Sequence, residues 1–163
     1  MSEPAAVVVR LAHEADVPAL HALIGELAEY ERLQEQFVGQ AGQLGEHLFG
    51  QPRRAHALVA DHDGQVVGFA LYFFNYSTFL CRPGLYLEDL YVQPAWRRHG
   101  IGRSLLQALA REALAQGCGR MEWSVLDWNA PSIAFYRALG ARPMDEWTTF
   151  RLTGDALNRL GSG

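Results

Sequence analysis

The chain has 163 residues, of which 49% are hydrophobic and 20% charged, and its formal net charge at pH 7 is −4. This composition is that of an ordinary globular protein, and it excludes a mainly disordered chain. The negative charge argues against a nucleic-acid partner and suits a small cationic substrate, and no apolar run approaches the ~20 residues that cross a bilayer.

The two cysteines, Cys81 and Cys118, have no metal-like spacing. No secretory signal precedes the first predicted strand. We therefore expect reduced thiols, a cytoplasmic location, and neither a bound metal nor a membrane partner.

The first half of the chain predicts strands and helices from its apolar spacing. Leu20, Leu23 and Leu27 recur at helical intervals after Asp16, a candidate N-cap. His62-Asp63-Gly64 separates two apolar runs and favours a hairpin. The predicted elements are a strand over 7–11, a helix to about Glu31, a shorter helix over 41–49, and strands over 55–60 and 66–74.

The second half begins with an irregular link over 75–84. A strand over 85–92, a long helix from Ile101 closed by Gly117, and a strand over 121–126 imply one parallel crossover. A short helix over 131–139 and a final strand over 147–152 follow. With no internal repeat or linker, we expect one α/β (α+β) domain over residues 1–163, with a mixed, mostly antiparallel sheet flanked by helices on both faces.

A turn rich in arginine and glycine joins the strand over 85–92 to the long helix. It reads Arg97-Arg98-His99-Gly100-Ile101-Gly102. Amides at the start of a helix are unpaired and the helix dipole is positive there, so the turn predicts an anion site. A P-loop is excluded because the chain has no lysine, and a Rossmann turn would need glycine where Leu105 stands. A plain strand-to-helix connection is the alternative.

The turn is similar to the pyrophosphate loop, Arg/Gln-x-x-Gly-x-Gly/Ala, of the GNAT superfamily of N-acetyltransferases. Other segments look like the spermidine/spermine and thialysine N-acetyltransferase group within it. These segments are Glu26-Leu27-Ala28-Glu29-Tyr30-Glu31, Tyr86-Leu87-Glu88-Asp89, Val125-Leu126-Asp127-Trp128-Asn129 and Tyr136-Arg137-Ala138-Leu139-Gly140-Ala141. The resemblance implies the GNAT fold, acetyl-CoA-dependent acetylation of primary amines, and a homodimer.

The resemblance also implies which residues meet acetyl-CoA. Backbone groups of the strand would bind the pantetheine arm, the turn would wrap the diphosphate, and the start of the short helix would meet the coenzyme again. These residues are Leu90, Tyr91 and Val92; Arg97, Arg98, His99, Gly100, Ile101, Gly102 and Arg103; and Asn129, Ala130, Pro131 and Ser132. The arginines could equally form a solvated patch, and Asn129 could be a helix cap.

Tyr136 matches the proton donor of this group, and Glu88 is the candidate base. A phenol of pKa ~10 can protonate a leaving thiolate whose acid has pKa ~8.5. We expect the Glu88 carboxylate to lie among apolar neighbours and to take the amine proton through water. A packed aromatic and a solvated edge-strand acid are the alternatives.

Tyr30 and Glu31 match a substrate-contacting pair, with Glu31 and Glu88 attracting the cation. Polyamine enzymes carry an acid and a tryptophan where this chain has Ser77 and Phe79, which puts long polyamines in doubt. The segment from Arg142 to Trp147 is shorter than in that group, so any role of Glu146 there is tentative.

The expected function is acetyl transfer to a primary amine of a thialysine, diamine or polyamine type by direct attack in a ternary complex. One alternative is another acceptor, such as an amino acid, an aminoglycoside or a protein N-terminus. A non-catalytic acyl-CoA sensing module is the other, but it would need neither Tyr136 nor Glu88.

Overall fold

The structure, a computed structural model, describes residues 6–163. Its backbone contacts divide the chain into one unit that ends at Ser124 and a second unit from Val125 to Gly163. The first unit contains β1 (Val8–Leu11), α1 (Val17–Tyr30), α2 (Ala41–Phe49), β2 (His56–His62), β3 (Gln65–Ser77), β4 (Arg82–Val92), α3 (Ile101–Ala115) and β5 (Met121–Trp123). The second contains α4 (Ala130–Ala138) and α5 (Gly154–Gly161).

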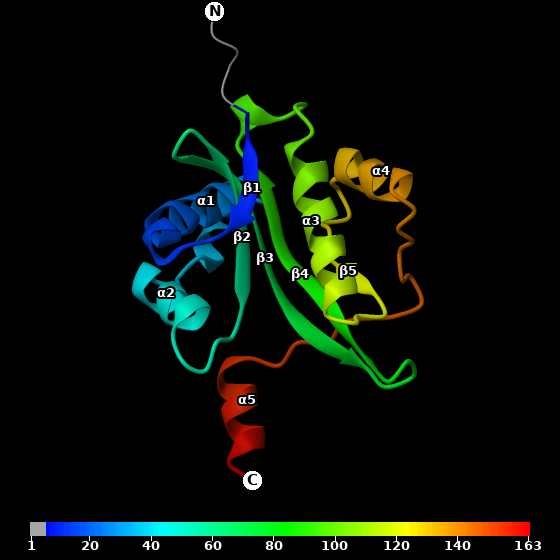
Figure 1. Ribbon diagram of the computed structural model, residues 1–163. Coiled ribbons are helices and arrows are strands. Elements are labelled where there is room, and N and C mark those ends of the chain that lie inside the picture. The colour runs from blue at the N-terminus through cyan, green and yellow to red at the C-terminus, as the bar shows by residue number, and fades with distance from the viewer. Residues whose placement is uncertain (1–5) are drawn as a thin grey trace, which may run out of the picture. The chain divides into compact units, whose positions relative to one another are not determined.

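The first unit is built on one sheet with the strand order β1-β2-β3-β4-β5. The pairs β1–β2, β2–β3 and β3–β4 are antiparallel, and β5 runs parallel to β4 after the crossover through α3. Ala57 and Val59 of β2 pack with α1 and α2, so the alternate residue Leu58 points to the other face, where α3 lies (Figure 1). The predicted mixed sheet with helices on both faces is confirmed.

The start of α1 differs in one detail from the sequence prediction. Asp16 occupies the N-cap position, but its side chain does not bond to the first turn of the helix. Its carboxylate instead accepts hydrogen bonds from the Arg10 guanidinium, at 2.7 and 3.0 Å, and from the His13 amide at 2.7 Å. Arg10 also donates to Asp61 at 3.0 Å, so this cluster ties the start of α1 to β1 and β2.

The segment over 75–84, predicted as an irregular link, is regular for most of its length. Residues 75–77 belong to β3 and residues 82–84 to β4, with Ser77 opposite Arg82, so only residues 78–81 form the turn. Gly84 leaves room in this pairing for the Asn75 side chain of the facing strand, whose Oδ1 a Cβ at Gly84 would displace. The link prediction was wrong because cross-strand fit is not visible in one strand's own sequence.

Of the two strands predicted nearest the C-terminus, one is shorter than predicted and the other does not form. The strand over 121–126 ends at Trp123, and residues 147–152 form no strand within the described part of the chain. Phe150 in that segment is 93% exposed. A strand needs a neighbouring strand to satisfy its backbone, so β-favouring residues alone do not make one. The helix α5 after it was not predicted.

Candidate active site

The turn before α3 has the backbone of an anion site. Gly100 adopts a left-handed conformation with φ of 75°, and the Ser104 amide donates the first helical hydrogen bond to the Gly100 carbonyl at 3.0 Å. The amides of Ile101, Gly102 and Arg103 precede that bond and have no acceptor in the helix. A Cβ added at Gly100 or Gly102 would meet no atom within 4 Å, so the space beside the turn is open. These residues fit a diphosphate.

The edge of β4 opens beside this turn. β5 pairs only with Leu85, Tyr86 and Leu87, so β4 continues to Val92 without a neighbour on that side. The Gln93 amide donates to the Val67 carbonyl of β3. The antiparallel alternation then turns the backbone groups of Tyr91 toward β3 and those of Leu90 and Val92 toward the open edge. Leu90 and Val92 thus present main-chain groups to a ligand, and Tyr91 does not.

Glu88 is the extra residue of a β-bulge in β4. Leu71 of β3 lies opposite Asp89 while its neighbour Tyr72 lies opposite Leu87, which leaves Glu88 without a partner. Bulges redirect side chains and are frequent beside active sites. The Glu88 side chain is exposed, so the expectation that it lies among apolar neighbours was wrong, because regular alternation stops at the bulge.

Asp89 is the desolvated acid that the sequence analysis did not select. Burial raises its pKa to about 6, and the nearby charges of Glu88 and Glu31 contribute in the same direction. Burial also raises the pKa of Glu31, which follows the last residue of α1. Glu31, Glu88 and Asp89 together form an acidic cluster that a cation would stabilise. Two adjacent acids in an otherwise apolar strand were the available sequence signal.

Arg97 and Tyr30 lie together in the first unit. The guanidinium carbon of Arg97 is 5.0 Å from the centre of the Tyr30 ring and 5.6 Å from that of Tyr91. Its Nε donates to the Val92 carbonyl at 3.0 Å. The side chain of Arg97 therefore extends toward α1 and β4, whereas Arg98 and Arg103 form no ion pair among the described residues.

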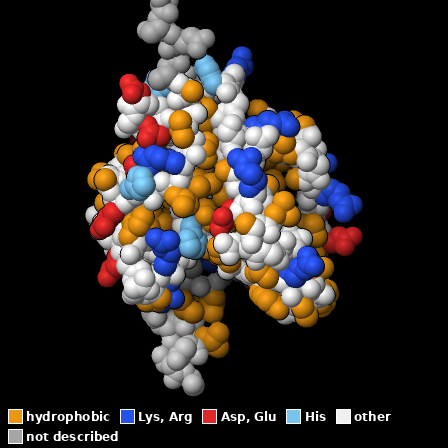
Figure 2. Space-filling model, in the orientation of Figure 1, with side chains coloured by type: hydrophobic (Ala, Val, Ile, Leu, Met, Phe, Trp, Pro, Cys, Tyr) orange, Lys and Arg blue, Asp and Glu red, His pale blue; other side chains and the backbone are white. Residues whose placement is uncertain are grey.

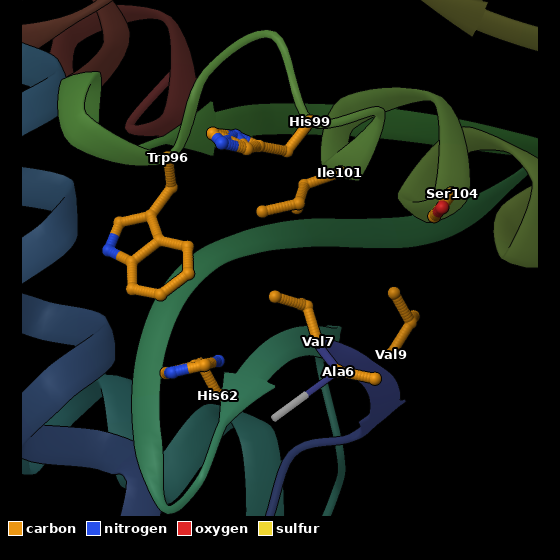
Figure 3. A pocket seen from close by; sticks show the side chains of 8 residues that line it. All are labelled: Ala6, Val7, Val9, His62, Trp96, His99, Ile101 and Ser104. Carbon is orange, nitrogen blue, oxygen red and sulfur yellow. The ribbon is translucent and has the colours of Figure 1, made fainter. Parts of the chain in front are cut away.

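A cavity of about 460 Å³ lies beside the same turn (Figure 3). Trp96 and His62 contact each other with ring centres 4.4 Å apart, and His99 and Ile101 also line it. The remaining lining residues are Ala6, Val7, Val9 and Ser104. None of the lining residues is acidic, so this cavity does not suit a cationic amine. The side chains of His99 and Ile101 face this cavity, so these two residues would contact a diphosphate through their main chain.

The second unit holds the other sequence-predicted residues at one helix. The Asn129 side chain accepts a hydrogen bond from the Ser132 amide at 3.3 Å, and Pro131 lies in the first turn of α4. The helix-cap interpretation of Asn129 is thereby confirmed. Tyr136 is half-buried one turn later, with its ring centre 5.7 Å from that of Phe135.

Several classes of site and surface are not represented. No group of three or more metal-ligating side chains occurs within residues 6–163. None of the described helices is both long and apolar enough to span a membrane. On the face in Figure 2, acidic and basic side chains are interspersed with apolar ones.

Comparison with known proteins assigns this arrangement to a family. The model of the acetyltransferase (GNAT) family matches residues 24–141. The chain belongs to the GNAT family of acetyltransferases. It is 40% identical over 165 residues to the thialysine N-epsilon-acetyltransferase of Bos taurus, covering 94% of this chain and 96% of that protein. It is 33% identical over 197 residues to an L-ornithine N5-acetyltransferase of Arabidopsis thaliana, covering 93% and 86%.

The fold of this GNAT acetyltransferase has solved counterparts. A protein from an integron cassette of V. cholerae superposes with a TM-score of 0.81 at 25% identity, covering 96% of this chain and 98% of that one. The five-stranded mixed sheet with helices is therefore the GNAT fold, and the chain is an N-acetyltransferase related to the thialysine and diamine enzymes.

Proposed function

We propose that this enzyme transfers an acetyl group from acetyl-CoA to a primary amine of a small cationic molecule of the thialysine, diamine or polyamine type. The observation that carries the proposal is the cluster of Glu31, Glu88 and Asp89 beside the open edge of β4. A second positive charge on the substrate would relieve the repulsion among these acids. The bovine and Arabidopsis relatives, named for thialysine and ornithine, support this substrate class.

The coenzyme would lie along β4 and the turn before α3. In this proposal, Leu90 and Val92 bind the pantetheine arm through their outward backbone groups. The amides of residues 98–103 and the guanidinium groups of Arg98 and Arg103 bind the diphosphate, whose charge the dipole of α3 also opposes. We propose a further contact of the coenzyme at residues 129–132.

Since the family match runs through Ser124 and Val125 without a break, we propose a single catalytic domain.

The proposed reaction is a direct attack in a ternary complex. At pH 7 an alkylammonium of pKa ~10.4 must first lose a proton, which costs about 4 to 5 kcal/mol. Glu88 is the proposed acceptor of that proton, through water, because the bulge leaves its carboxylate exposed to solvent. The amine nitrogen then bonds to the thioester carbon, the carbon–sulfur bond breaks, and the Tyr136 hydroxyl gives its proton to the departing sulfur. The nitrogen loses its second proton to water, and a proton from solvent restores the Tyr136 phenol.

Two features bear on the choice of amine. Where the polyamine enzymes carry an acid, Ser77 is buried and its hydroxyl accepts a hydrogen bond from the Leu80 amide at 3.3 Å, which holds the β3–β4 turn. Phe79 in that turn is almost fully exposed. With no acid at this position, we favour a short diamine or a diamino acid over a long polyamine. A substrate role of Glu146 stays a prediction.

A homodimer is also proposed, on the strength of the exposed apolar residues near the C-terminus. Trp147 and Phe150 are among them, and exposed apolar side chains in a run commonly mark an interface. The cytoplasmic location stays a prediction.

The test is an amine panel assayed for released CoA thiol, with the acetylated product identified by mass spectrometry. Thialysine, ornithine and a short diamine should have the highest kcat/KM, spermine a lower one, and an aminoglycoside or a peptide N-terminus the lowest. An order led by the peptide or the aminoglycoside would establish the alternative acceptor class. Tight binding of acetyl-CoA without transfer to any amine would favour the sensing module.

A further inference from the structure

The position of the Arg97 side chain does not fit the diphosphate role that its place in the sequence motif implies. Arg97 follows the short turn Pro94–Trp96, and its Nε donates to the Val92 carbonyl, five residues earlier, at 3.0 Å. Its guanidinium carbon lies 5.0 Å from the Tyr30 ring centre at the end of α1. The guanidinium group thus contacts the Tyr30 ring, on the predicted substrate side, and the Val92 carbonyl, in the strand predicted to bind the coenzyme.

The second ring that meets Arg97 is itself held in place. Tyr91 donates its hydroxyl proton to Glu26 at 3.3 Å, and Gln93 donates to the same carboxylate at 3.1 and 3.4 Å. Glu26 belongs to α1, so these bonds join α1 to β4. A guanidinium near two aromatic rings, one of them held in place, gains cation–π stabilisation that a solvated arginine lacks.

Val92 gives this contact a consequence for the coenzyme. Its backbone groups point toward the open edge of β4, where the pantetheine arm is proposed to lie. The Arg97 Nε occupies one lone-pair direction of the Val92 carbonyl and fixes the orientation of that peptide group. A substitution of Arg97 would therefore affect both the strand along which the pantetheine is proposed to lie and Tyr30, which is next to Glu31.

We propose that Arg97 is a positioning residue that couples the amine pocket to the coenzyme strand, and that it does not bind the diphosphate. This inference rests on the proposed function, since it assumes acetyl-CoA along β4 and an amine near Glu31. Binding of the diphosphate is left to the main chain of the turn and to Arg98 and Arg103, which have no ion-pair partner among residues 6–163.

The experiment compares Arg97→Met with Arg98→Met as a matched control. Calorimetry gives the Kd of acetyl-CoA and of S-acetylpantetheine, which lacks the diphosphate, and steady-state kinetics give the KM of the best amine. Arg97→Met should weaken both thioesters by a similar factor and raise the amine KM roughly threefold to tenfold, as expected for a lost cation–π contact. Arg98→Met should weaken acetyl-CoA alone.

Arg97→Lys supplies the conservative substitution, because a lysine can keep a cation over the rings. Its amine KM should lie between that of Arg97→Met and that of the wild type. A purely structural defect would not be corrected in this way. The inference is overturned if Arg97→Met weakens acetyl-CoA and leaves acetylpantetheine binding and the amine KM unchanged. It is equally overturned if none of the three constants changes. A wild-type protein that binds no acetyl-CoA would instead refute the proposed function, before any variant is compared.

Discussion

The amide nitrogen of Ser104 lies 3.0 Å from the carbonyl oxygen of Gly100, and this hydrogen bond begins α3. Gly100 reaches it from a left-handed conformation, with φ of 75°. An L-residue with a Cβ is disfavoured there by about 1–2 kcal/mol, so the turn would shift in a Gly100→Ala variant.

We therefore expect Gly100→Ala to weaken acetyl-CoA binding more than amine binding, as measured by calorimetry. Gly117→Ala is the matched control, because Gly117 follows the other end of α3 with φ of 74° and open space around it. It should cost similar stability and leave the Kd of acetyl-CoA unchanged. Equal effects of the two variants on that Kd would show that the turn has no special role in coenzyme binding.

Asp89 links stability to pH through its pKa of about 6. Its unfolded value is near 3.9, so between pH 4 and 6 the folded state binds more protons than the unfolded state, and stability falls as pH rises through that window. Asp89→Asn should remove this loss of unfolding free energy, which is up to about 3 kcal/mol, and so raise the Tm at pH 7.5. It should also increase the KM of a cationic amine. A Tm that is lower at pH 7.5 and unchanged in its pH dependence would contradict the burial of this charge.

Glu88→Gln is the comparison for Asp89→Asn, since Glu88 is the exposed acid of the cluster. It should change the Tm little and move the pH profile of kcat/KM toward alkaline values, because the amine would then have to lose its proton to solvent. If the profile were identical to that of the wild type, another group would have to be the base.

Tyr136→Phe keeps the ring on α4 and removes the hydroxyl. Loss of a general acid typically lowers kcat by about 10² to 10⁴, and we expect a fall in this range with the Kd of acetyl-CoA within about twofold of the wild type. Rapid-quench and steady-state kinetics measure the first quantity and calorimetry the second. A kcat equal to that of the wild type would remove Tyr136 from the mechanism.

Arg10 stabilises the corner where β1, β2 and α1 meet. It bonds to Asp16 and Asp61, and its guanidinium holds the pKa of Asp16 below its usual value. Because Asp16 is buried, Arg10→Met leaves an unpaired charge and should cost about 2 to 3 kcal/mol of unfolding free energy at pH 7. The folded pKa is the lower one, so this contribution is present above pH 4 and is lost as pH falls through the folded value.

The control for Arg10 is Arg120→Met. Arg120 pairs with Glu122 at 3.1 Å, but both side chains are substantially exposed, and such pairs are worth about 0 to 1 kcal/mol. Denaturant unfolding at pH 7 and pH 3 measures both variants. Equal losses for the two at pH 7 would show that burial of Asp16 does not matter.

Local patterns predicted the parts of the fold that are locally determined. The periodic leucines predicted α1, the helical segment closed by Gly117 predicted α3, and the His62-Asp63-Gly64 turn predicted the β2–β3 hairpin. Gly100 and Gly102, on either side of Ile101, predicted the turn of the anion site. Each depends on residues close together in the chain, so the sequence contained the necessary information.

What the sequence did not predict depends on pairing between distant residues. The bulge at Glu88 arises from the register of β4 against β3, and it exposes Glu88 while Asp89 becomes the acid whose pKa burial raises. Arg97 stands first in a phosphate motif, yet its side chain meets Tyr30, more than sixty residues earlier in the chain. The prediction of a strand over 147–152 was wrong for the same kind of reason, because a strand forms only where a partner strand is available.

A crystal structure with acetyl-CoA and a short diamine tests the central claim most directly. The account predicts the diphosphate on the amides of residues 98–103, the pantetheine along Leu90 and Val92, and the far ammonium of the diamine at Glu31 or Asp89. A coenzyme that leaves the turn before α3 empty and places its acetyl group in another cleft would contradict it.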